Sequence, residues 1–218
     1  MISLDVWGTI LRVNPIFARL RRELFFTYLG KGSINRTDFF AAFEEMKITT
    51  ERLSEQEGRH VGFTERLKHL TDKLQLTPFY AYTQLEEEQN KMCLNHPPTL
   101  LSEEIPRLLS DIKDCDIGLV VVSNTGLIRS EVVEQILETY HIKKYIDRFI
   151  FSDHTKLAKP NPKIFYEALG NPTTHALHVG DSLRADFEGA QRAGFSALHM
   201  ELSSSNIRVL RQILKLDV

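Results

Sequence analysis

The stretch Leu4-Asp5-Val6-Trp7-Gly8-Thr9 decides the fold, because an aspartate ends a short apolar run that turns at once into Gly-Thr. The run from Ile2 to Val6 has the length of a buried strand. A carboxylate behind such a strand lies at the edge of the sheet where open α/β folds bind their ligands. Asp5 is therefore a candidate nucleophile or metal ligand, although an isolated aspartate in this position can also simply cap a turn.

Four more apolar runs of strand length occupy the second half of the chain. These expected strands are 117–123, 149–152, 176–179 and 196–200. Helical spacing of apolar residues covers 103–113, 128–140, 162–169, 186–193 and 205–214. The alternation predicts βαβ units, and strands that are apolar on both faces predict a parallel sheet covered by helices on both sides.

The section between the first strand and the others contains no convincing strand. Helices are expected from Pro15, from Asn35 or Thr37, over 63–74 and over 80–92. Asn14 is the expected cap of the first helix, Thr77-Pro78 separates the last two, and His96-Pro97-Pro98 forms the return.

We expect this section to be a separate domain. Residues 14–96 would form a small all-helical cap, and residues 1–13 together with 97–218 would form an α/β core. The phenylalanines of the insert, Phe39, Phe40 and Phe43, are interpreted as its own core. If they lined a pocket instead, they would favour an apolar leaving group.

Composition and charge limit the classes of function. The 218 residues, 42% of them hydrophobic and 26% charged, are typical of a globular protein. A net charge of -2 gives no electrostatic reason to expect nucleic acid or an acidic membrane as partner. Cys93 and Cys115 have neither metal-ligand nor redox spacing. There is no membrane-spanning pattern, and Asp5 lies too near Met1 for a cleavable leader. We expect a cytoplasmic monomer or homodimer with a small-molecule substrate.

Three further polar motifs follow the later strands. Ser123-Asn124 can hold an oxyanion at a helix N-terminus, or merely cap that helix. Lys159 is fixed by Pro160 and can neutralise a phosphoryl group, although a lone lysine is more often a surface residue. Gly180-Asp181-Ser182, followed by Asp186, offers paired carboxylates that suit Mg²⁺, although Asp186 also suits a helix N-terminus.

Because each motif follows an apolar strand, all of them converge on one edge of the expected sheet. The chain resembles the haloacid dehalogenase (HAD) superfamily, whose four motifs match, in order, Asp5-Val6-Trp7-Gly8-Thr9, Ser123-Asn124, Lys159-Pro160-Asn161-Pro162 and Gly180-Asp181-Ser182 through Asp186. The insert stands where members of this family carry a cap. The resemblance implies a Rossmann-like doubly wound α/β core with a small all-α cap over the active site.

The resemblance also implies roles for individual residues. Asp5 would be the nucleophile, and the phosphate ligands would be Ser123, Asn124 and Lys159. Mg²⁺ would be bound by Asp5, Asp181 and the main-chain carbonyl of Trp7. Supporting roles would fall to Thr9, Ser182 and Asp186, the last through a hydrogen bond to Lys159 or to a metal-bound water.

Trp7 departs from the family pattern. Phosphatases of the family usually carry a second aspartate two residues after the nucleophile, which protonates the leaving alcohol and then activates water. An indole can do neither, and loss of a general acid–base slows a reaction by ~10² to 10⁴. The metal contact from position 7 uses the main chain, so Mg²⁺ binding would survive. Trp7 can also be an apolar side chain that fills space beneath the cap.

Four functions therefore remain open. We expect a Mg²⁺-dependent hydrolase of a phosphate monoester, working through an aspartyl-phosphate at Asp5 with another proton donor, for which His60 is a candidate. A dehalogenase-like hydrolase would need a cap arginine, for which the chain offers Arg19, Arg22 and Arg36. A phosphonate hydrolase would need a cap lysine, for which it offers Lys31 and Lys47. The last alternative is a phosphate-binding protein without turnover. Asp181 and Asp186 favour the first, because paired carboxylates repel each other without a cation.

Overall fold

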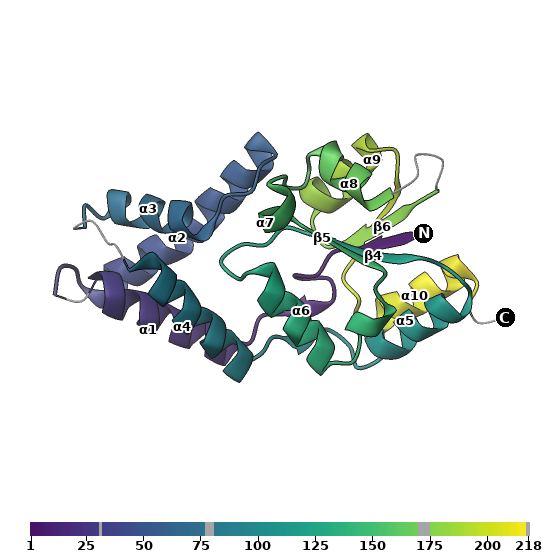
Figure 1. Cartoon of the computed structure of the whole chain (residues 1–218), viewed down its shortest axis with the longest axis horizontal. Helices are drawn as coiled ribbons and strands as arrows, with labels where there is room; N and C mark the ends of the chain where they lie inside the picture. The colour runs from purple at the N-terminus through teal and green to yellow at the C-terminus, as the bar shows by residue number, and fades with distance from the viewer. Residues whose placement is uncertain (31, 77–80, 170–174, 217–218) are drawn as a thin grey trace.

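The computed structural model describes residues 1–30, 32–76, 81–169 and 175–216. Lys31, the expected break at Thr77-Pro78 and the start of the expected helix 80–92 lie outside these residues. The described chain forms two parts, a sheet with its flanking helices and a group of helices beside it (Figure 1).

A five-stranded parallel sheet forms the centre of the first part. Its strands are β1 (Ile2–Leu4), β4 (Leu119–Ser123), β5 (Arg148–Phe151), β6 (Leu177–Gly180) and β7 (Ser196–His199). Their spatial order is β5-β4-β1-β6-β7, so the chain builds one side of β1 first and then crosses to the other. The five expected strands are confirmed, with bounds that differ by one or two residues. The crevice at such a reversal is where α/β sheets bind ligands.

Helices cover both faces of this sheet, as the apolar strands predicted. One face packs on α5 (Ile105–Asp114), α6 (Ser130–Thr139) and α10 (Ser204–Leu214), and the other on α8 (Pro162–Leu169) and α9 (Gly189–Arg192). Side chains alternate along β4, so Leu119 and Val121 join the first cluster while Val120 and Val122 join the second. The core is therefore a doubly wound α/β fold.

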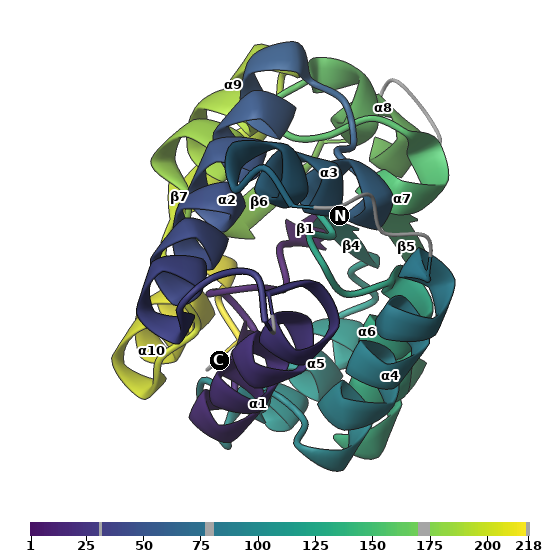
Figure 2. The same ribbon diagram turned by 90° about the vertical axis from the view of Figure 1, so that its left-hand side faces the viewer.

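The insert after the first strand is helical. It consists of α1 (Pro15–Phe25), the π-helical turn η1 (Phe26–Gly30), α2 (Arg36–Glu57), α3 (Phe63–Lys73) and α4 (Tyr82–Asn95). Asn14 caps α1 through a bond from Ile16 N of 2.9 Å, and Asn35 caps α2 through a bond from Asp38 N of 2.9 Å. Figure 2 shows the four helices grouped in front of the sheet.

These helices pack around their own hydrophobic cluster. Phe39 and Phe43 are fully buried in it, and Phe40 packs against it. The rings of Phe25 and Phe43 meet edge to face, with centroids 5.0 Å apart. The interpretation of the insert phenylalanines as core residues is thereby confirmed.

Several short elements were not expected from the sequence. The two connections between sheet and insert pair with each other as antiparallel strands, β2 (Leu11–Arg12) and β3 (Thr99–Leu100). The expected helix 186–193 is interrupted, since the π-helical turn η3 (Leu183–Glu188) precedes α9. Single turns η2 (Lys143–Tyr145) and α7 (Ser152–Thr155) flank β5. Elements of two to four residues are too short to show a periodic pattern.

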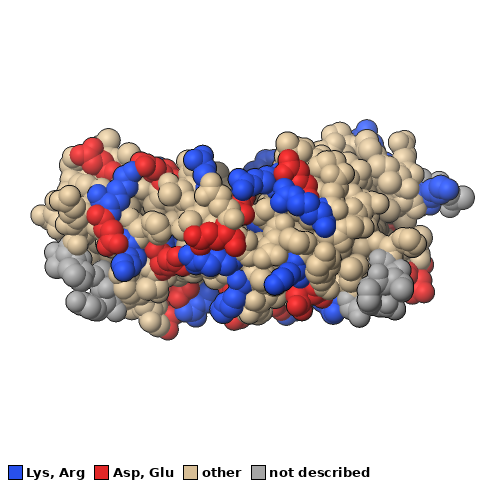
Figure 3. Space-filling view, turned by 90° about the horizontal axis from the view of Figure 1, so that it is seen from above, with Lys and Arg blue, Asp and Glu red and all other residues tan. Residues whose placement is uncertain are grey.

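None of the described helices combines the length and the apolar character needed to cross a bilayer. On the face shown in Figure 3, acidic and basic side chains lie interspersed, without one large patch of a single sign.

Candidate active site at the carboxyl ends of the strands

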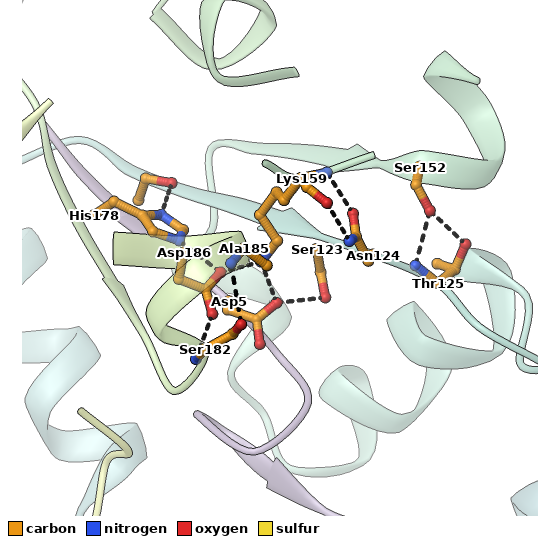
Figure 4. Close-up of polar contacts among 11 residues, drawn as sticks. Asp5, Ser123, Asn124, Thr125, Ser152, Lys159, His178, Ser182, Ala185 and Asp186 are labelled. Carbon is orange, nitrogen blue, oxygen red and sulfur yellow. Dashed lines mark hydrogen bonds and ion pairs between the residues drawn. The ribbon is translucent and has the colours of Figure 1, made fainter. Parts of the chain in front are cut away.

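Asp5 lies directly beyond β1, and groups from the end of β4 and from the loop after α7 contact it (Figure 4). The hydroxyl of Ser123, the last residue of β4, donates to Asp5 Oδ1 over 2.8 Å. The Lys159 ammonium donates to the same oxygen over 2.6 Å. Asp5 is buried, and its Oδ2 has no hydrogen-bond partner among the described residues. One carboxylate oxygen is thus fixed while the other stays available.

Lys159 links two of the predicted carboxylates. Its ammonium also donates to Asp186 Oδ1 over 2.5 Å, so the expected contact between Asp186 and Lys159 is present. The lysine is only 2% exposed, and a cis peptide bond joins it to Pro160. Burial lowers the pKa of Lys159, but the charges of Asp186 and Asp5 outweigh it and raise that pKa. Lys159 is therefore a fixed cation beside Asp5.

Asn124 holds the main chain of Lys159. The amide of Asn124 donates to the carbonyl of Lys159 over 3.0 Å and accepts from its N–H over 2.8 Å. Both ends of this side chain are therefore engaged within the protein. These bonds let Asn124 position Lys159, and the contact of Asn124 with phosphate that the resemblance implies stays a prediction.

Asp186 is the centre of a buried polar network that the sequence did not reveal. His178 Nε2 lies 3.1 Å from Asp186 Oδ1, and His178 Nδ1 lies 2.8 Å from the hydroxyl of Ser3. Ser3 and His178 are fully buried, and they stand opposite each other in the pairing of β1 with β6. Because a carboxylate only accepts, the geometry assigns the proton to Nε2 and makes Ser3 the donor to Nδ1. In the sequence, this network could have been recognised from Ser3 and His178, two polar residues at matching positions of otherwise apolar strands.

Ser182 closes this network from the other side. Its N–H donates to Asp186 Oδ2 over 2.9 Å, and its hydroxyl accepts from Ala185 N over 3.0 Å. Ser182 is thus the N-cap of η3. Both oxygens of Asp186 are therefore occupied by protein donors, which makes it a support for Lys159.

Asp181 lies one residue beyond β6, against the turn that follows Asp5. A Cβ placed on Gly8 would come within 2.1 Å of Asp181 Oδ2, and the φ of Gly8 is +78°. Only a glycine fits this close approach and this backbone conformation. Asp181 is exposed, and no hydrogen bond to its side-chain oxygens occurs within the described residues.

The donors of this edge fit a hard divalent cation. Carboxylate oxygens of Asp5, Asp181 and Asp186 all lie within 4.8 Å of one another. Three carboxylates facing one ammonium leave an excess of negative charge, and Mg²⁺ prefers such oxygen donors. Since Asp186 is occupied by other donors, Asp5 and Asp181 are the two carboxylates with free oxygens.

Burial and like charge both oppose ionisation of these two acids. Burial is the main reason why the pKa of Asp5 is raised, the charge of Asp186 adds to it, and Lys159 opposes it. Although Asp181 is exposed, its carboxyl group is partly desolvated, which raises its pKa, and the charge of Asp186 adds to this. Asp186 itself is buried too, but Lys159 and His178 outweigh this and lower its pKa. A cation between Asp5 and Asp181 would relieve the repulsion.

Trp7 and Thr9 occupy the turn after Asp5. The Trp7 side chain packs partly against the core cluster beneath the sheet edge and also faces the cavity described below. Thr9 is fully buried, and its hydroxyl has no partner in the part of the chain that the structure describes. Its carbonyl accepts from Leu202 N over 2.9 Å, which ties the turn to the segment after β7.

A cavity of about 610 Å³ opens between this sheet edge and the helical insert. Asp5, Trp7 and Asp181 line it from the sheet. The insert contributes side chains from α1, α2 and α3, which include Phe17, Arg21, Lys47, Glu51, Glu55 and Arg66. The volume suits a small molecule.

Several residues suggested by the sequence lie elsewhere. His60 lines a second cavity, where its Nδ1 lies 3.0 Å from the hydroxyl of Ser152. The arginines Arg19, Arg22 and Arg36 do not line the cavity at Asp5. Lys47 does line it, but its ammonium is paired with Glu44 at 2.7 Å. The arginine that faces the cavity from α1 is Arg21, which the sequence did not single out.

Comparison with known proteins identifies the family. Residues 34–200 match the family described as haloacid dehalogenase-like hydrolase. Over 80 residues the chain is 36% identical to the Bos taurus haloacid dehalogenase-like hydrolase domain-containing protein 3, which covers 35% of this chain and 30% of that protein. Over 56 residues it is 43% identical to a glyceraldehyde 3-phosphate phosphatase of Methanopyrus kandleri, covering 24% of each. The matches thus span less than a third of these curated relatives.

A solved structure resembles the chain over its whole length. The HAD-hydrolase YfnB from Bacillus subtilis, bound to magnesium, superposes with a TM-score of 0.73 and 21% identity, covering 98% of this chain and 97% of the other. At this level of identity the likeness concerns the fold.

Proposed function

Because the chain belongs to the haloacid dehalogenase-like hydrolases, we propose that it hydrolyses a small phosphate monoester, with Asp5 as nucleophile and Mg²⁺ as cofactor. The observation that carries the proposal is the environment of Asp5, a buried carboxylate with one oxygen fixed by Ser123 and Lys159 and the other free. The phosphatase from Methanopyrus kandleri among the similar proteins supports phosphate chemistry.

In the proposed reaction, a carboxylate oxygen of Asp5 forms a bond to phosphorus and the bond from phosphorus to the leaving alcohol oxygen breaks. The product is an aspartyl-phosphate, and water then attacks its phosphorus to release phosphate and restore Asp5. Lys159 neutralises negative charge on the phosphoryl oxygens, and Ser123 keeps the carboxylate oriented. Asn124 and Asp186 hold Lys159 in place.

Asp5 and Asp181 would hold Mg²⁺, together with the main-chain carbonyl of Trp7. When bound, this cation would offset the charge of the phosphoryl group and of the carboxylates. Asp186, which is occupied by Lys159, His178 and Ser182, supports the arrangement without contacting the cation.

Trp7 leaves open where the leaving alcohol obtains its proton, and we propose Glu55 as the donor. Glu55 lines the cavity from α2, and its carboxylate lies 3.8 Å from Arg184. Burial raises the pKa of Glu55, and the positive charge of Arg184 opposes this. The charge of Asp186 raises this pKa further, whereas that of Lys159 lowers it. An acid with a raised pKa that lines the same cavity as Asp5 is suited to general acid catalysis.

We also propose that residues 14–96 act as a cap domain that moves relative to the sheet. The pairing of β2 with β3 places both connections side by side, where they can act as one hinge. Most buried residues of the insert form a cluster of their own, which supports movement of the insert as one body.

The first test is phosphate release from a panel of phosphate monoesters, including p-nitrophenyl phosphate, with Mg²⁺ or with EDTA. Wild type, Asp5→Asn, Asp181→Asn and the distant control Asp147→Asn would be compared. We expect turnover that needs Mg²⁺, is abolished by Asp5→Asn and is strongly reduced by Asp181→Asn, with Asp147→Asn close to wild type. No phosphate release from wild type, combined with metal-independent halide release from 2-haloacids, would replace this proposal by the dehalogenase alternative.

A further inference from the structure

His178 lies behind Asp186 in the interior of the sheet part and does not line the cavity at Asp5. Its side chain is fully buried, and its ring meets that of Phe165 edge to face, with centroids 5.1 Å apart. An apolar side chain would fill this space without taking two ring nitrogens out of water, which is unfavourable unless both are hydrogen-bonded. Packing alone therefore does not account for a histidine here.

The contacts of His178 connect the start of β1 with the residue at its end. The Ser3 hydroxyl lies 2.8 Å from His178 Nδ1, and His178 Nε2 lies 3.1 Å from Asp186 Oδ1 (Figure 4). The Lys159 ammonium lies 2.5 Å from the same oxygen of Asp186 and 2.6 Å from Asp5 Oδ1. The series of hydrogen bonds thus leaves β1 at Ser3 and returns to its end at Asp5, and all five side chains are buried.

The two donors that share Asp186 Oδ1 differ in stiffness. The Lys159 ammonium ends a flexible chain of four carbons, whereas the His178 imidazole is a rigid ring whose second nitrogen contacts Ser3. The other oxygen of Asp186 accepts from Ser182 N over 2.9 Å. The His178 ring and the Ser182 main chain therefore fix the carboxylate, and the carboxylate in turn holds the lysine.

Asp186 lies close against the strand that carries His178. A Cβ on Gly180, the last residue of β6, would come within 2.2 Å of Asp186 Cγ. The absence of a side chain at Gly180 thus lets the carboxylate approach β6, where His178 Nε2 can reach it.

The imidazole of His178 carries its proton at Nε2. Burial lowers the pKa of His178, and the hydrogen bond to Asp186 opposes this only in part, so the ring is neutral at pH 7. A neutral imidazole has one donor and one acceptor nitrogen, and a carboxylate can only accept. Nε2 therefore donates to Asp186, and the Ser3 hydroxyl donates to Nδ1 and fixes this tautomer.

We propose that His178 is a positioning residue, whose Nε2–H holds the Asp186 carboxylate in the orientation that keeps the Lys159 ammonium against Asp5. Without this N–H, the carboxylate turns about its side-chain bonds and carries the ammonium away from Asp5. The inference rests on the proposed function only for its effect on turnover, because the position of Lys159 can be measured without a substrate.

Two substitutions of His178 and one matched control test the inference. His178→Phe keeps an aromatic ring against Phe165 and removes both nitrogens. His178→Gln supplies an N–H donor near the position of Nε2. Phe195→Leu is the control, because the Phe195 ring also meets that of Phe165, at 5.5 Å, and lies outside the polar series. Crystal structures would give the position of Lys159, and steady-state kinetics with p-nitrophenyl phosphate and Mg²⁺ would give kcat and KM.

We expect the Lys159 ammonium to leave hydrogen-bond distance of Asp5 in His178→Phe and to keep it in His178→Gln and Phe195→Leu. In His178→Phe, kcat should fall about 10- to 100-fold, the range found when a group that orients a site residue is removed, while KM stays within about threefold. His178→Gln should recover most of kcat. An unchanged position of Lys159 in His178→Phe would overturn the inference, and so would an equal loss of kcat in Phe195→Leu.

The tautomer is measured in wild type, whether or not any variant folds. In a ¹⁵N-labelled sample, we expect His178 to show a protonated Nε2 and an unprotonated Nδ1. A proton at Nδ1 alone, or protons at both nitrogens at pH 7, would overturn the assigned direction of the hydrogen bonds and with it the inference.

The same measurements separate this inference from the proposed function. If wild type hydrolyses no phosphate monoester, while Lys159 is displaced in His178→Phe and restored in His178→Gln, the proposed function fails and the role of His178 stands. If wild type hydrolyses phosphate monoesters and His178→Phe changes neither kcat nor the position of Lys159, the proposed function stands and the role of His178 fails.

Discussion

At the scale of single residues, the site depends on the two carboxylates that the Lys159 ammonium contacts. Its ammonium joins Asp5, which needs one free oxygen, to Asp186, whose oxygens are fully engaged. His178 and Ser3 extend this chain into the interior between β1 and β6. Buried hydrogen bonds of this kind hold Lys159, Asp186 and one oxygen of Asp5 in one arrangement, so the proposed nucleophile is oriented before substrate arrives.

Trp7 gives the first prediction at this scale. Without a second acid at this position, protonation of an alkyl leaving group should depend on Glu55, whereas p-nitrophenolate leaves without a proton. Glu55→Gln should slow alkyl phosphates about 10²-fold or more and p-nitrophenyl phosphate much less. Trp7→Asp in the Glu55→Gln background should restore part of the alkyl phosphate rate.

Steady-state kinetics on a series of leaving groups would check this prediction. Trp7→Phe is the matched control, because it removes the indole without supplying an acid. If Glu55→Gln lowered the rates of all substrates equally, Glu55 would have no role as the proton donor.

Gly8 gives the second prediction. In Gly8→Ala the new Cβ would lie 2.1 Å from the Asp181 carboxylate, and the residue would keep a φ of +78°. We expect a loss of about 1 kcal/mol or more in the free energy of unfolding, together with weaker Mg²⁺ binding because Asp181 is displaced.

Chemical denaturation and Mg²⁺ titration would measure both effects. Gly118→Ala is the control, since its Cβ would meet ordinary contacts of 3.6 Å or more at the opposite end of β4. Equal Mg²⁺ affinity in Gly8→Ala and wild type would argue against Asp181 as a metal ligand.

At the scale of elements, the loop between α2 and α3 contacts the segment that carries Lys159, and we call this contact the clasp. Arg59 pairs with Leu157 in an isolated antiparallel β-bridge. Ala158 N donates to Gly58 O over 3.1 Å, and Asn161 Nδ2 donates to the same carbonyl over 3.0 Å. The insert therefore contacts the sheet part next to Lys159 as well as through β2 and β3. An opening motion of the insert would have to break this clasp.

His60 lies in the loop that forms the clasp, and its titration makes the free energy of unfolding depend on pH. Burial lowers the pKa of His60 from its ordinary value of 6.5 to about 4. The unfolded chain therefore takes up this proton first as the pH falls. The contribution of the neutral His60 side chain to the free energy of unfolding is constant above pH 6.5 and is lost progressively between pH 6.5 and pH 4.

We predict that the free energy of unfolding falls less steeply in His60→Gln than in wild type across this range, by at most about 1.4 kcal/mol per pH unit. Urea denaturation at several pH values would measure both proteins. The difference between them at pH 7.5 serves as the internal control, because His60 is neutral in both states there. Parallel pH profiles would contradict the prediction.

At the scale of the whole molecule, each part has its own main hydrophobic cluster, although Phe17 and Cys93 of the insert join the cluster beneath the sheet and Leu127 joins the cluster of the insert. The cluster of the insert contains Phe43, and the cluster beneath the sheet contains Phe151, both fully buried. The cavity at Asp5 lies between these parts.

Phe43→Ala and Phe151→Ala test this division. Each should destabilise its own cluster by about 3–5 kcal/mol. Hydrogen exchange should accelerate mainly within 14–96 for Phe43→Ala and mainly within 97–216 for Phe151→Ala. Uniform acceleration over the chain in both variants would mean that the insert is not a separate domain.

The sequence by itself determined the order of the elements and the place of the site. Apolar runs and helical spacing depend only on neighbours in the chain, and they predicted the five strands of the sheet. Because parallel strands align their carboxyl ends, the same pattern brought Asp5, Ser123, Lys159 and Asp186 together.

Only the tertiary structure decided which side chains outside the motifs reach the site. Arg19, Arg21 and Arg22 are near neighbours on α1, and the spacing of a helix points them in different directions. Packing of α1 turns Arg21 toward the cavity, and the pairing of β1 with β6 joins Ser3 to His178. These contacts link residues far apart in the chain, so local sequence could not reveal them.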